Sequence, residues 1–324
     1  MRVHIYILLL IVFVFSAPVM AADKDHSFKL NGYKRAFTVH TPPSYKYDRK
    51  MPMVMVLHGG GGNNKHVVEQ TKMNETADKR GFIVVYPEGT GRKFHTWNAG
   101  ACCGKAKDKN VDDVAFISKL IDEMGKLYNI DKKRVYSTGL SNGAMMSYRL
   151  SCELSDKITA IAPVAAQNIT IPCKAKRAVP TIHFHGTADR CALYGGGQCG
   201  GCFADIFKSI GIPMKKKLWE CKPVLDTVEA RAAEFSCKSS SEIVYRKGDV
   251  TCQRWSGCSG GAEVELCSIE NGGHNWPRKD LVPSNCVSRP NGKICKARKK
   301  SMGHVTQDIN INEAMWAFFS HFSL

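Results

Sequence analysis

The chain has 324 residues, of which 44% are hydrophobic, and its formal net charge is +17. That apolar content can bury the core of one large domain or two modest ones, which excludes an intrinsically disordered chain. The basic residues are scattered and match no recognition motif. We therefore expect no specific nucleic-acid partner, although the positive field can attract an anionic surface.

The N-terminus has the pattern of a cleaved export signal. Arg2 precedes an apolar run over residues 5–15, and small side chains at Val19 and Ala21 suit signal peptidase. The run is shorter than the roughly 20 residues that cross a bilayer. We expect removal of residues 1–21, no membrane span afterwards, and a secreted or periplasmic protein. An uncleaved membrane anchor is the alternative.

Fourteen cysteines in an exported chain indicate a disulfide framework, because the compartments outside the cytoplasm are oxidising. The number of possible pairings leaves the connectivity open. Cys199 and Cys202 enclose two glycines and also fit half of a zinc site or a redox dithiol. A second pair of ligands at metal spacing is missing, which favours disulfides.

In the first half of the chain, strand and helix patterns alternate. Short strands flank Asn31-Gly32, a pair that favours a tight type I′ hairpin. The elements expected next are a strand over 53–57, a helix over 66–80, a strand over 82–86 and a helix over 111–128. The last of these has Val114, Ile117, Ile121 and Met124 on one face.

The second half continues the same alternation. It predicts a strand over 134–138, a turn over 139–143, a helix over 144–154, and strands over 158–165 and 179–184. A Gly- and Cys-rich insertion or lid is expected over 190–236, then a strand over 263–269, a basic insertion over 278–303, and a helix over 312–322. This order predicts an α/β fold with a mostly parallel central sheet covered by helices on both faces.

The segment Gly139-Leu140-Ser141-Asn142-Gly143 matches G-x-S-x-G between a predicted strand and a predicted helix. In such a turn the serine hydroxyl projects above the sheet, and glycine is needed where neighbouring backbone comes close. An ordinary Gly/Ser/Asn turn is the alternative. The context predicts that Ser141 is the nucleophile of an α/β-hydrolase fold, with residues 22–324 as a single catalytic domain.

A serine nucleophile needs a general base and an acid that orients the base, and α/β-hydrolases carry both on loops after later strands. Asp189 follows the strand that ends at 184, and His274 lies in a glycine loop after 263–269. We predict Asp189 as the acid and His274 as the base. The other candidates for the acid are Asp205, Asp226 and Asp249. For the base, His304 and His321 follow too late or lie in the last predicted helix, and His183 and His185 precede the acid.

The tetrahedral intermediate of acyl transfer needs N–H donors for its oxyanion. We predict the backbone amides of Asn142, at the start of the helix, and of Gly60 or its neighbour Gly61, in a glycine run that can also be a flexible turn. Trp97 and Trp276 are predicted to form an apolar wall beside the acyl group, with burial in the core as the alternative.

Four motifs in order resemble the polyhydroxybutyrate depolymerase and feruloyl esterase family. They are His58-Gly59-Gly60-Gly61, the turn from Gly139 to Met145, His185-Gly186-Thr187-Ala188-Asp189, and Gly272-Gly273-His274-Asn275-Trp276-Pro277. The resemblance implies hydrolysis of carboxylic esters, either hydroxyalkanoates or hydroxycinnamate esters, without a metal or organic cofactor. It also implies a Cys237–Cys258 disulfide. The segment 190–236 is longer and richer in cysteine than this family pattern.

Three other functions fit parts of the sequence. A serine peptidase would use the same three residues, since a histidine base serves either leaving group. A thiol–disulfide enzyme would depend on Cys199 and Cys202 instead. A non-catalytic secreted binding protein would keep the fold without the chemistry.

Overall fold

The computed structural model describes residues 21–169, 173, 175–202, 204, 208, 211, 218–278, 286, 288–289, 291–293, 295–296, 300 and 303–324. The predicted export leader, apart from Ala21, lies outside these residues, and so do Asp205 and more than half of segment 278–303. Within the described residues, no helix is both long enough and apolar enough to span a membrane.

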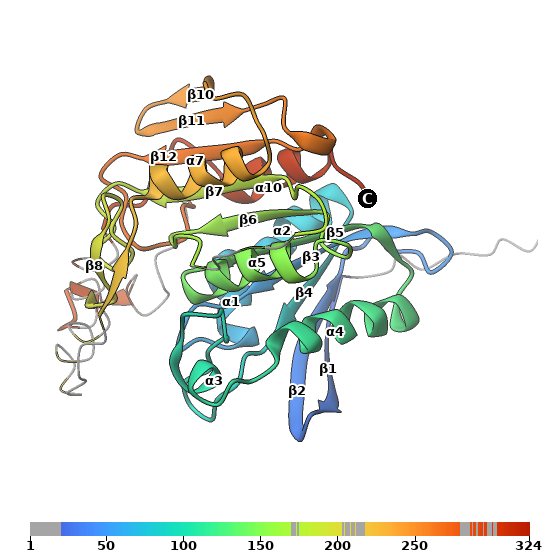
Figure 1. The fold of residues 1–324 in the computed structure, drawn as a ribbon. Helices are drawn as coiled ribbons and strands as arrows, with labels where there is room; N and C mark the ends of the chain where they lie inside the picture. Colours follow the sequence, from blue (N-terminus) through green and yellow to red (C-terminus); the bar gives the residue numbers. More distant parts are fainter. Residues whose placement is uncertain are drawn as a thin grey trace, which may run out of the picture.

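The strands form one large sheet with a parallel centre and antiparallel edges (Figure 1). Its order is β1-β2-β4-β3-β5-β6-β7-β12-β11-β10. The parallel strands are β4 (Ile83–Pro87), β3 (Met51–Leu57), β5 (Ile130–Leu140), β6 (Ala160–Val164), β7 (Thr181–Gly186) and β12 (Val264–Ile269). Since parallel strands end at the same edge of a sheet, loops after β5, β7 and β12 share one edge.

Helices cover both faces of the sheet, as predicted for an α/β fold. One apolar core lies under α4 (Asp113–Leu127), α5 (Asn142–Glu153) and α7 (Val224–Glu234), which are in front in Figure 1. The other lies under α1 (Asn64–Thr71), α2 (Met73–Arg80) and α10 (Ile311–Phe319), behind the sheet. Strands β3 and β4 are buried throughout, since both faces are covered. A short helix, α3 (Gly104–Asp108), precedes α4.

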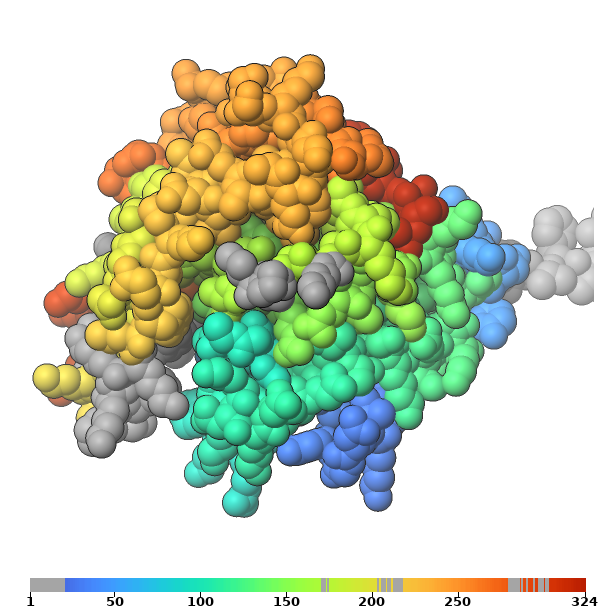
Figure 2. Space-filling model, in the orientation of Figure 1, coloured from blue at the N-terminus to red at the C-terminus, as the bar shows by residue number. Residues whose placement is uncertain are grey.

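The N-terminal hairpin has the predicted turn. Strands β1 (Ala22–Leu30) and β2 (Tyr33–Thr41) pair antiparallel around Asn31 and Gly32, whose φ angles are +48° and +77°. Positive φ at both positions is what a type I′ turn requires. Figure 2 shows this blue hairpin at the opposite end of the molecule from the orange β10–β11 region.

The single helix predicted over 66–80 is wrong, because α1 and α2 are separated at Lys72, which adopts φ +46°. The side chain of Arg278 donates to the carbonyl oxygens of Thr71 and Lys72, at 3.2 Å each. Asn312 donates to the Thr71 carbonyl at 2.9 Å. These partners lie more than 200 residues away, so the break depends on tertiary contacts that no local pattern contains.

The structure also corrects the insertion predicted over 190–236. Helix α7 packs on β12 and contributes Val224 and Val228 to the core, so it belongs to the layer that covers the sheet. The part outside the main sheet holds a small pair of strands, β8 (Gly197–Cys199) and β9 (Trp219–Cys221). Two further strands without a predicted counterpart, β10 (Glu242–Lys247) and β11 (Val250–Trp255), extend the sheet past β12.

All fourteen cysteines are paired, which confirms the disulfide interpretation. Cys237 bonds Cys258, as the family resemblance implies. The other pairs are Cys102–Cys103, Cys152–Cys173, Cys191–Cys202, Cys199–Cys221, Cys252–Cys267 and Cys286–Cys295. Cys199 and Cys202 therefore bond different partners, which contradicts both the zinc and the redox-dithiol interpretations.

A buried ion pair joins the N-terminal hairpin to α4. The guanidinium of Arg35 lies 2.6 Å from the Asp113 carboxylate, and the side chains are 3% and 0% exposed. The second carboxylate oxygen of Asp113 accepts from the amide of Asn98 at 2.7 Å. Arg35 also lies over the ring of Phe116, at 3.8 Å from its centroid.

We predict that Arg35→Met lowers the free energy of unfolding by about 3–5 kcal/mol, because it leaves the Asp113 carboxylate buried without its counter-ion. Denaturant titration measures this. The matched control is Lys65→Met, which breaks the solvent-exposed pair with Asp25 and should cost less than about 1 kcal/mol. Equal losses in the two variants would contradict the prediction.

Candidate active site

The predicted nucleophile lies in a tight turn between β5 and α5. Ser141 has φ +55°, a conformation that costs energy for a residue with a side chain. A Cβ atom on Gly143 would lie 2.3 Å from the carbonyl oxygen of Leu57, and one on Gly139 would lie 2.6 Å from the same oxygen. The crowding of β3 against this turn therefore explains both glycines of the motif.

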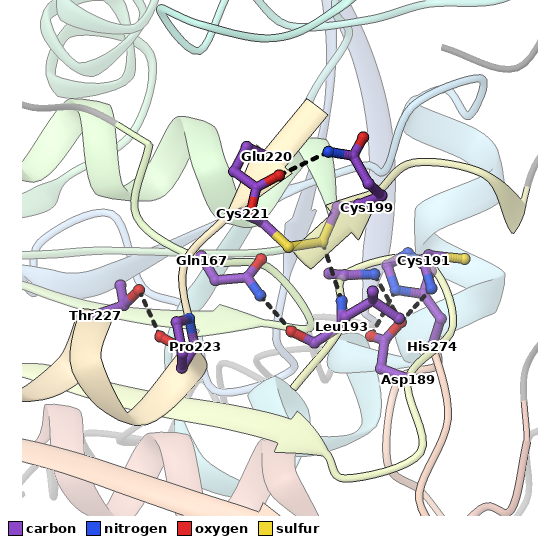
Figure 3. The surroundings of a disulfide bond; sticks show 12 residues. Gln167, Asp189, Cys191, Leu193, Cys199, Glu220, Cys221, Pro223, Thr227 and His274 are labelled. Atoms are coloured by element: carbon purple, nitrogen blue, oxygen red, sulfur yellow. Dashed lines mark hydrogen bonds and ion pairs between the residues drawn. A yellow bond between two sulfur atoms is a disulfide. The ribbon is translucent and has the colours of Figure 1, made fainter. Parts of the chain in front are cut away.

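The predicted acid and base are hydrogen-bonded to each other (Figure 3). His274 Nδ1 lies 2.8 Å from Asp189 Oδ2, and both residues are buried. The other oxygen, Oδ1, accepts from the backbone amides of Cys191 and Ala192 at 2.7 and 2.8 Å. A carboxylate can only accept, so Nδ1 carries the hydrogen and Nε2 is the basic nitrogen of the neutral ring.

The carboxyl group of Asp189 is held in its ionised form. Burial alone would raise its pKa, but the charge of His274 and hydrogen bonds from His185 and His274 outweigh burial and lower the pKa below its usual value. The carboxylate therefore keeps its charge over the working range of an imidazole base.

The loops that carry the acid and the base are joined directly. β7 and β12 are neighbours in the sheet, and the amide of Ala188 donates to the carbonyl of Gly272 at 2.9 Å. A Cβ atom on Gly186 would lie only 2.2 Å from the same carbonyl oxygen. This close approach of two backbones fixes the distance between the acid loop and the base loop.

The alternative acids and bases lie elsewhere. Asp226 is an exposed residue in the first turn of α7. Asp249 lies in the turn between β10 and β11 and pairs with His304 at 2.6 Å, where the histidine side chain is 49% exposed. The carbonyl of His304 accepts from Gly273 at 3.3 Å, so this pair supports the base loop. His321 follows α10 at the surface.

The two residues predicted to donate to the oxyanion, Gly60 and Asn142, are neighbours in space. A Cβ atom on Gly60 would be 3.7 Å from the Cβ of Asn142. Gly61 is a poorer candidate, because its amide donates to the His95 carbonyl at 2.8 Å. Among the described residues, no acceptor bonds the Gly60 amide, and the first amides of a helix such as α5 have no partner within the helix. The geometry favours Gly60 over Gly61.

The side chains of Asn142, Trp97 and His58, for which the sequence predicted no positioning role, hold the backbone around these amides. The side-chain amide of Asn142 accepts a hydrogen bond from the Trp97 backbone N–H at 2.7 Å through its oxygen. Through its nitrogen it donates to the Trp97 carbonyl at 3.1 Å. The indole N–H of Trp97 donates to the His58 carbonyl at 3.0 Å. His58 donates from Nδ1 to the Gly59 carbonyl and accepts at Nε2 from the Gly89 amide. A histidine directly before a glycine run was the available signal.

The predicted substrate wall is not supported. Trp97 and Trp276 are 0% and 1% exposed, so neither indole faces a solvent-accessible acyl site. Trp276 donates its indole N–H to Asn312 at 2.9 Å. Both residues are interior residues, as the alternative interpretation held, and Trp97 contacts the site through Asn142 and His58.

One disulfide attaches the Cys-rich segment to the acid loop, and a second joins β8 to β9 within that segment. Cys191 follows Asp189 by two residues and bonds Cys202, while Cys199 bonds Cys221 at the end of β9. The amide of Leu193 donates to the Cys199 sulfur at 3.1 Å (Figure 3). Asp189, Cys191 and His274 bring potential metal-ligand atoms within 4.8 Å of one another, but the Cys191 sulfur is in a disulfide and cannot be a thiolate ligand.

Sequence comparisons relate the chain to known esterases. The family described as Esterase PHB depolymerase matches residues 35–191. A bifunctional acetylxylan esterase/xylanase of Neocallimastix patriciarum is 35% identical over 164 residues, covering 49% of this chain and 23% of that protein. Feruloyl esterase B of Piromyces equi is 29% identical over 246 residues, covering 74% and 42%. The chain thus spans less than half the length of these two relatives.

Among solved structures, an acetyl xylan esterase from Aspergillus awamori has a TM-score of 0.57 at 14% identity, covering 79% of this chain and 95% of that chain. A thermostable esterase has a TM-score of 0.51 at 14% identity, covering 93% and 63%. The sheet, its helical layers and this likeness define an α/β-hydrolase fold. Over residues 35–191, the chain resembles the esterase family whose model matches there, described as Esterase PHB depolymerase.

We predict that His58 makes stability depend on pH. Burial lowers the pKa of His58 from 6.5 to about 4. Between these values the unfolded chain binds a proton that the folded chain does not, so stability falls as the pH decreases from 6.5 to 4. Relative to His58→Gln, the unmodified protein should lose about 3 kcal/mol of unfolding free energy over this range.

The measurement is a series of denaturant titrations across that pH range. His321→Gln, at the exposed surface, is the matched control and should keep the pH dependence of the unmodified protein. An unchanged pH dependence in His58→Gln would contradict the assignment of a neutral, buried His58.

Proposed function

We propose that the protein is an exported serine esterase that hydrolyses carboxylic esters through an acyl-enzyme intermediate. The observation that carries this proposal is the 2.8 Å hydrogen bond between Asp189 and His274, on loops that share a sheet edge with the Ser141 turn. Nucleophilic acyl transfer requires a hydroxyl, an imidazole and a carboxylate close together. Three residues that are distant in sequence supply these groups at one edge of the sheet.

In this mechanism His274 Nε2 takes the proton of Ser141 as the hydroxyl oxygen attacks the ester carbonyl. Asp189 holds the ring through Nδ1 and stabilises the imidazolium. The amides of Gly60 and Asn142 donate to the oxyanion. His274 then returns the proton to the leaving alcohol, and the same base activates the water that releases the acid from Ser141.

The substrate class follows from the relatives rather than from a shaped pocket. Proteins named as acetylxylan and feruloyl esterases are among those most similar to this chain, and the matched family is described as PHB depolymerase. We propose that the substrate is a soluble ester whose acyl group is either short, such as acetyl, or aromatic, such as feruloyl. The seven disulfides support export to an oxidising compartment.

Ser141→Ala is expected to lower kcat for a p-nitrophenyl acyl ester by at least about 10⁴-fold, because no other group replaces the nucleophile. The unfolding midpoint should change little. Ser118→Ala, on the half-buried face of α4, is the control and should keep full activity.

A fluorophosphonate probe should label Ser141 in the unmodified protein and nothing in Ser141→Ala. Retained ester turnover in Ser141→Ala would refute its role as nucleophile. Turnover of peptide amides in preference to esters would favour a peptidase, and absence of labelling would favour a binding protein.

We predict that methyl ferulate or p-nitrophenyl acetate is hydrolysed with a kcat/KM at least about 10-fold above that for hydroxybutyrate oligomers, a difference that a few acyl contacts can supply. Steady-state rates on the three substrates test this. A preference for the oligomers would replace the proposed substrate class with a polyester, while leaving the mechanism intact.

A further inference from the structure

Strand β7 carries two buried histidines that the proposed mechanism does not use. His183 and His185 are 0% and 1% exposed, and their spacing of two residues puts them on the same face of the strand. His183 Nε2 lies 3.0 Å from His185 Nδ1. Four residues after His185 comes Asp189, so the pair leads toward the candidate acid.

The contacts at the two ends of the pair determine where the hydrogens lie. His185 Nε2 is 2.7 Å from the carbonyl oxygen of Ala192, which can only accept, so this nitrogen carries a hydrogen. In a neutral ring Nδ1 then accepts from His183 Nε2–H. His183 Nδ1 in turn accepts from the Tyr148 hydroxyl at 2.7 Å. All hydrogen bonds therefore point from Tyr148 toward the acid loop.

The burial of these groups favours this neutral arrangement. Burial lowers the pKa of His183 well below its usual value, which keeps its ring uncharged. Burial also raises the pKa of Tyr148 well above its usual value, so the hydroxyl remains a donor. A buried charge at that end belongs to Arg231, 5.8 Å from the centre of the Tyr148 ring, with Glu234 at 3.8 Å from the guanidinium.

At its other end, this series of hydrogen bonds contacts the candidate acid in two ways. His185 Nε2 is 3.4 Å from Asp189 Oδ2, the oxygen that His274 binds. It also holds the carbonyl of Ala192, whose amide binds Asp189 Oδ1 at 2.8 Å. The edge of the Tyr194 ring packs against His185, with centroids 5.8 Å apart. One N–H group therefore faces the carboxylate and also holds the residue whose amide binds that carboxylate.

We propose that Tyr148, His183 and His185 form a buried relay of hydrogen bonds that positions Asp189 against His274. The proposal rests on the proposed function for its kinetic consequences only. These three are positioning residues, because they act through Asp189 and the Ala192 peptide.

The kinetic test compares His185→Leu, which removes both nitrogens, with His185→Gln, whose amide N–H can reach the Ala192 carbonyl. His185→Leu should lower kcat by about 10- to 100-fold with little change in KM, because the misplaced acid no longer orients the base. The acidic limb of kcat/KM should move to lower pH, since a displaced carboxylate stabilises the imidazolium less. His185→Gln should restore most of kcat.

Tyr148→Phe removes the hydroxyl at the start of the relay. It should change kcat and shift the acidic limb in the same direction as His185→Leu, by a smaller amount. The matched control is Tyr136→Phe. That hydroxyl is also buried, but donates to the Phe322 carbonyl at 2.8 Å, outside the relay. It should affect the unfolding midpoint alone. If Tyr148→Phe and Tyr136→Phe behave alike in kcat and pH profile, the relay is refuted, even where His185→Leu does not fold.

A spectroscopic test does not depend on ester hydrolysis. With ¹⁵N-labelled histidine, the ring nitrogens of His183 and His185 should both show the Nε2–H tautomer at neutral pH, and the His183 signals should change in Tyr148→Phe. An Nδ1–H tautomer or a charged ring at either position would overturn the proposal. This outcome is separate from failure of the proposed function, which Ser141→Ala turnover reports.

Discussion

The geometry of the candidate site depends on how one buried carboxylate is held. Asp189 has backbone amides on one oxygen and His274 on the other, and its loop is tied to the base loop through the Ala188–Gly272 hydrogen bond. A buried carboxylate without such donors would be protonated or expelled to solvent. The donors thus keep the charge that a histidine base requires, at a fixed position beside the ring.

Much of this arrangement could be predicted from sequence because it leaves short sequence patterns. Gly139 and Gly143 flank Ser141 since β3 leaves no room for a Cβ atom, and the G-x-S-x-G pattern records that constraint. The alternation of apolar strands and amphipathic helices predicted the central strands and helices in chain order and the buried face of α4. Asp189 and His274 were selected by their positions after strands, which is a rule of parallel sheets.

The parts that sequence did not predict depend on distant partners. The break at Lys72 is held by Arg278 and Asn312, and the edge strand β10 is almost fully exposed, so it lacks the apolar alternation that marks a strand. Tryptophan is a residue type that often binds ligands, but Trp97 is instead hydrogen-bonded to Asn142, 45 residues away. Contacts of this kind have no periodicity and become visible only in the folded chain.

The histidines near the site differ in the group that accepts their ring N–H. This difference distinguishes the positioning histidines from the candidate base. His58 and His185 each use one N–H to hold a backbone carbonyl, of Gly59 and Ala192, in the loops beside the candidate oxyanion donor and acid. Burial keeps His58 neutral, since no carboxylate offsets its desolvation. His274 directs its N–H to a carboxylate instead, which stabilises the charged ring that base catalysis forms. The same side chain is thus a fixed donor where it meets a carbonyl and suited to carry a proton where it meets a carboxylate.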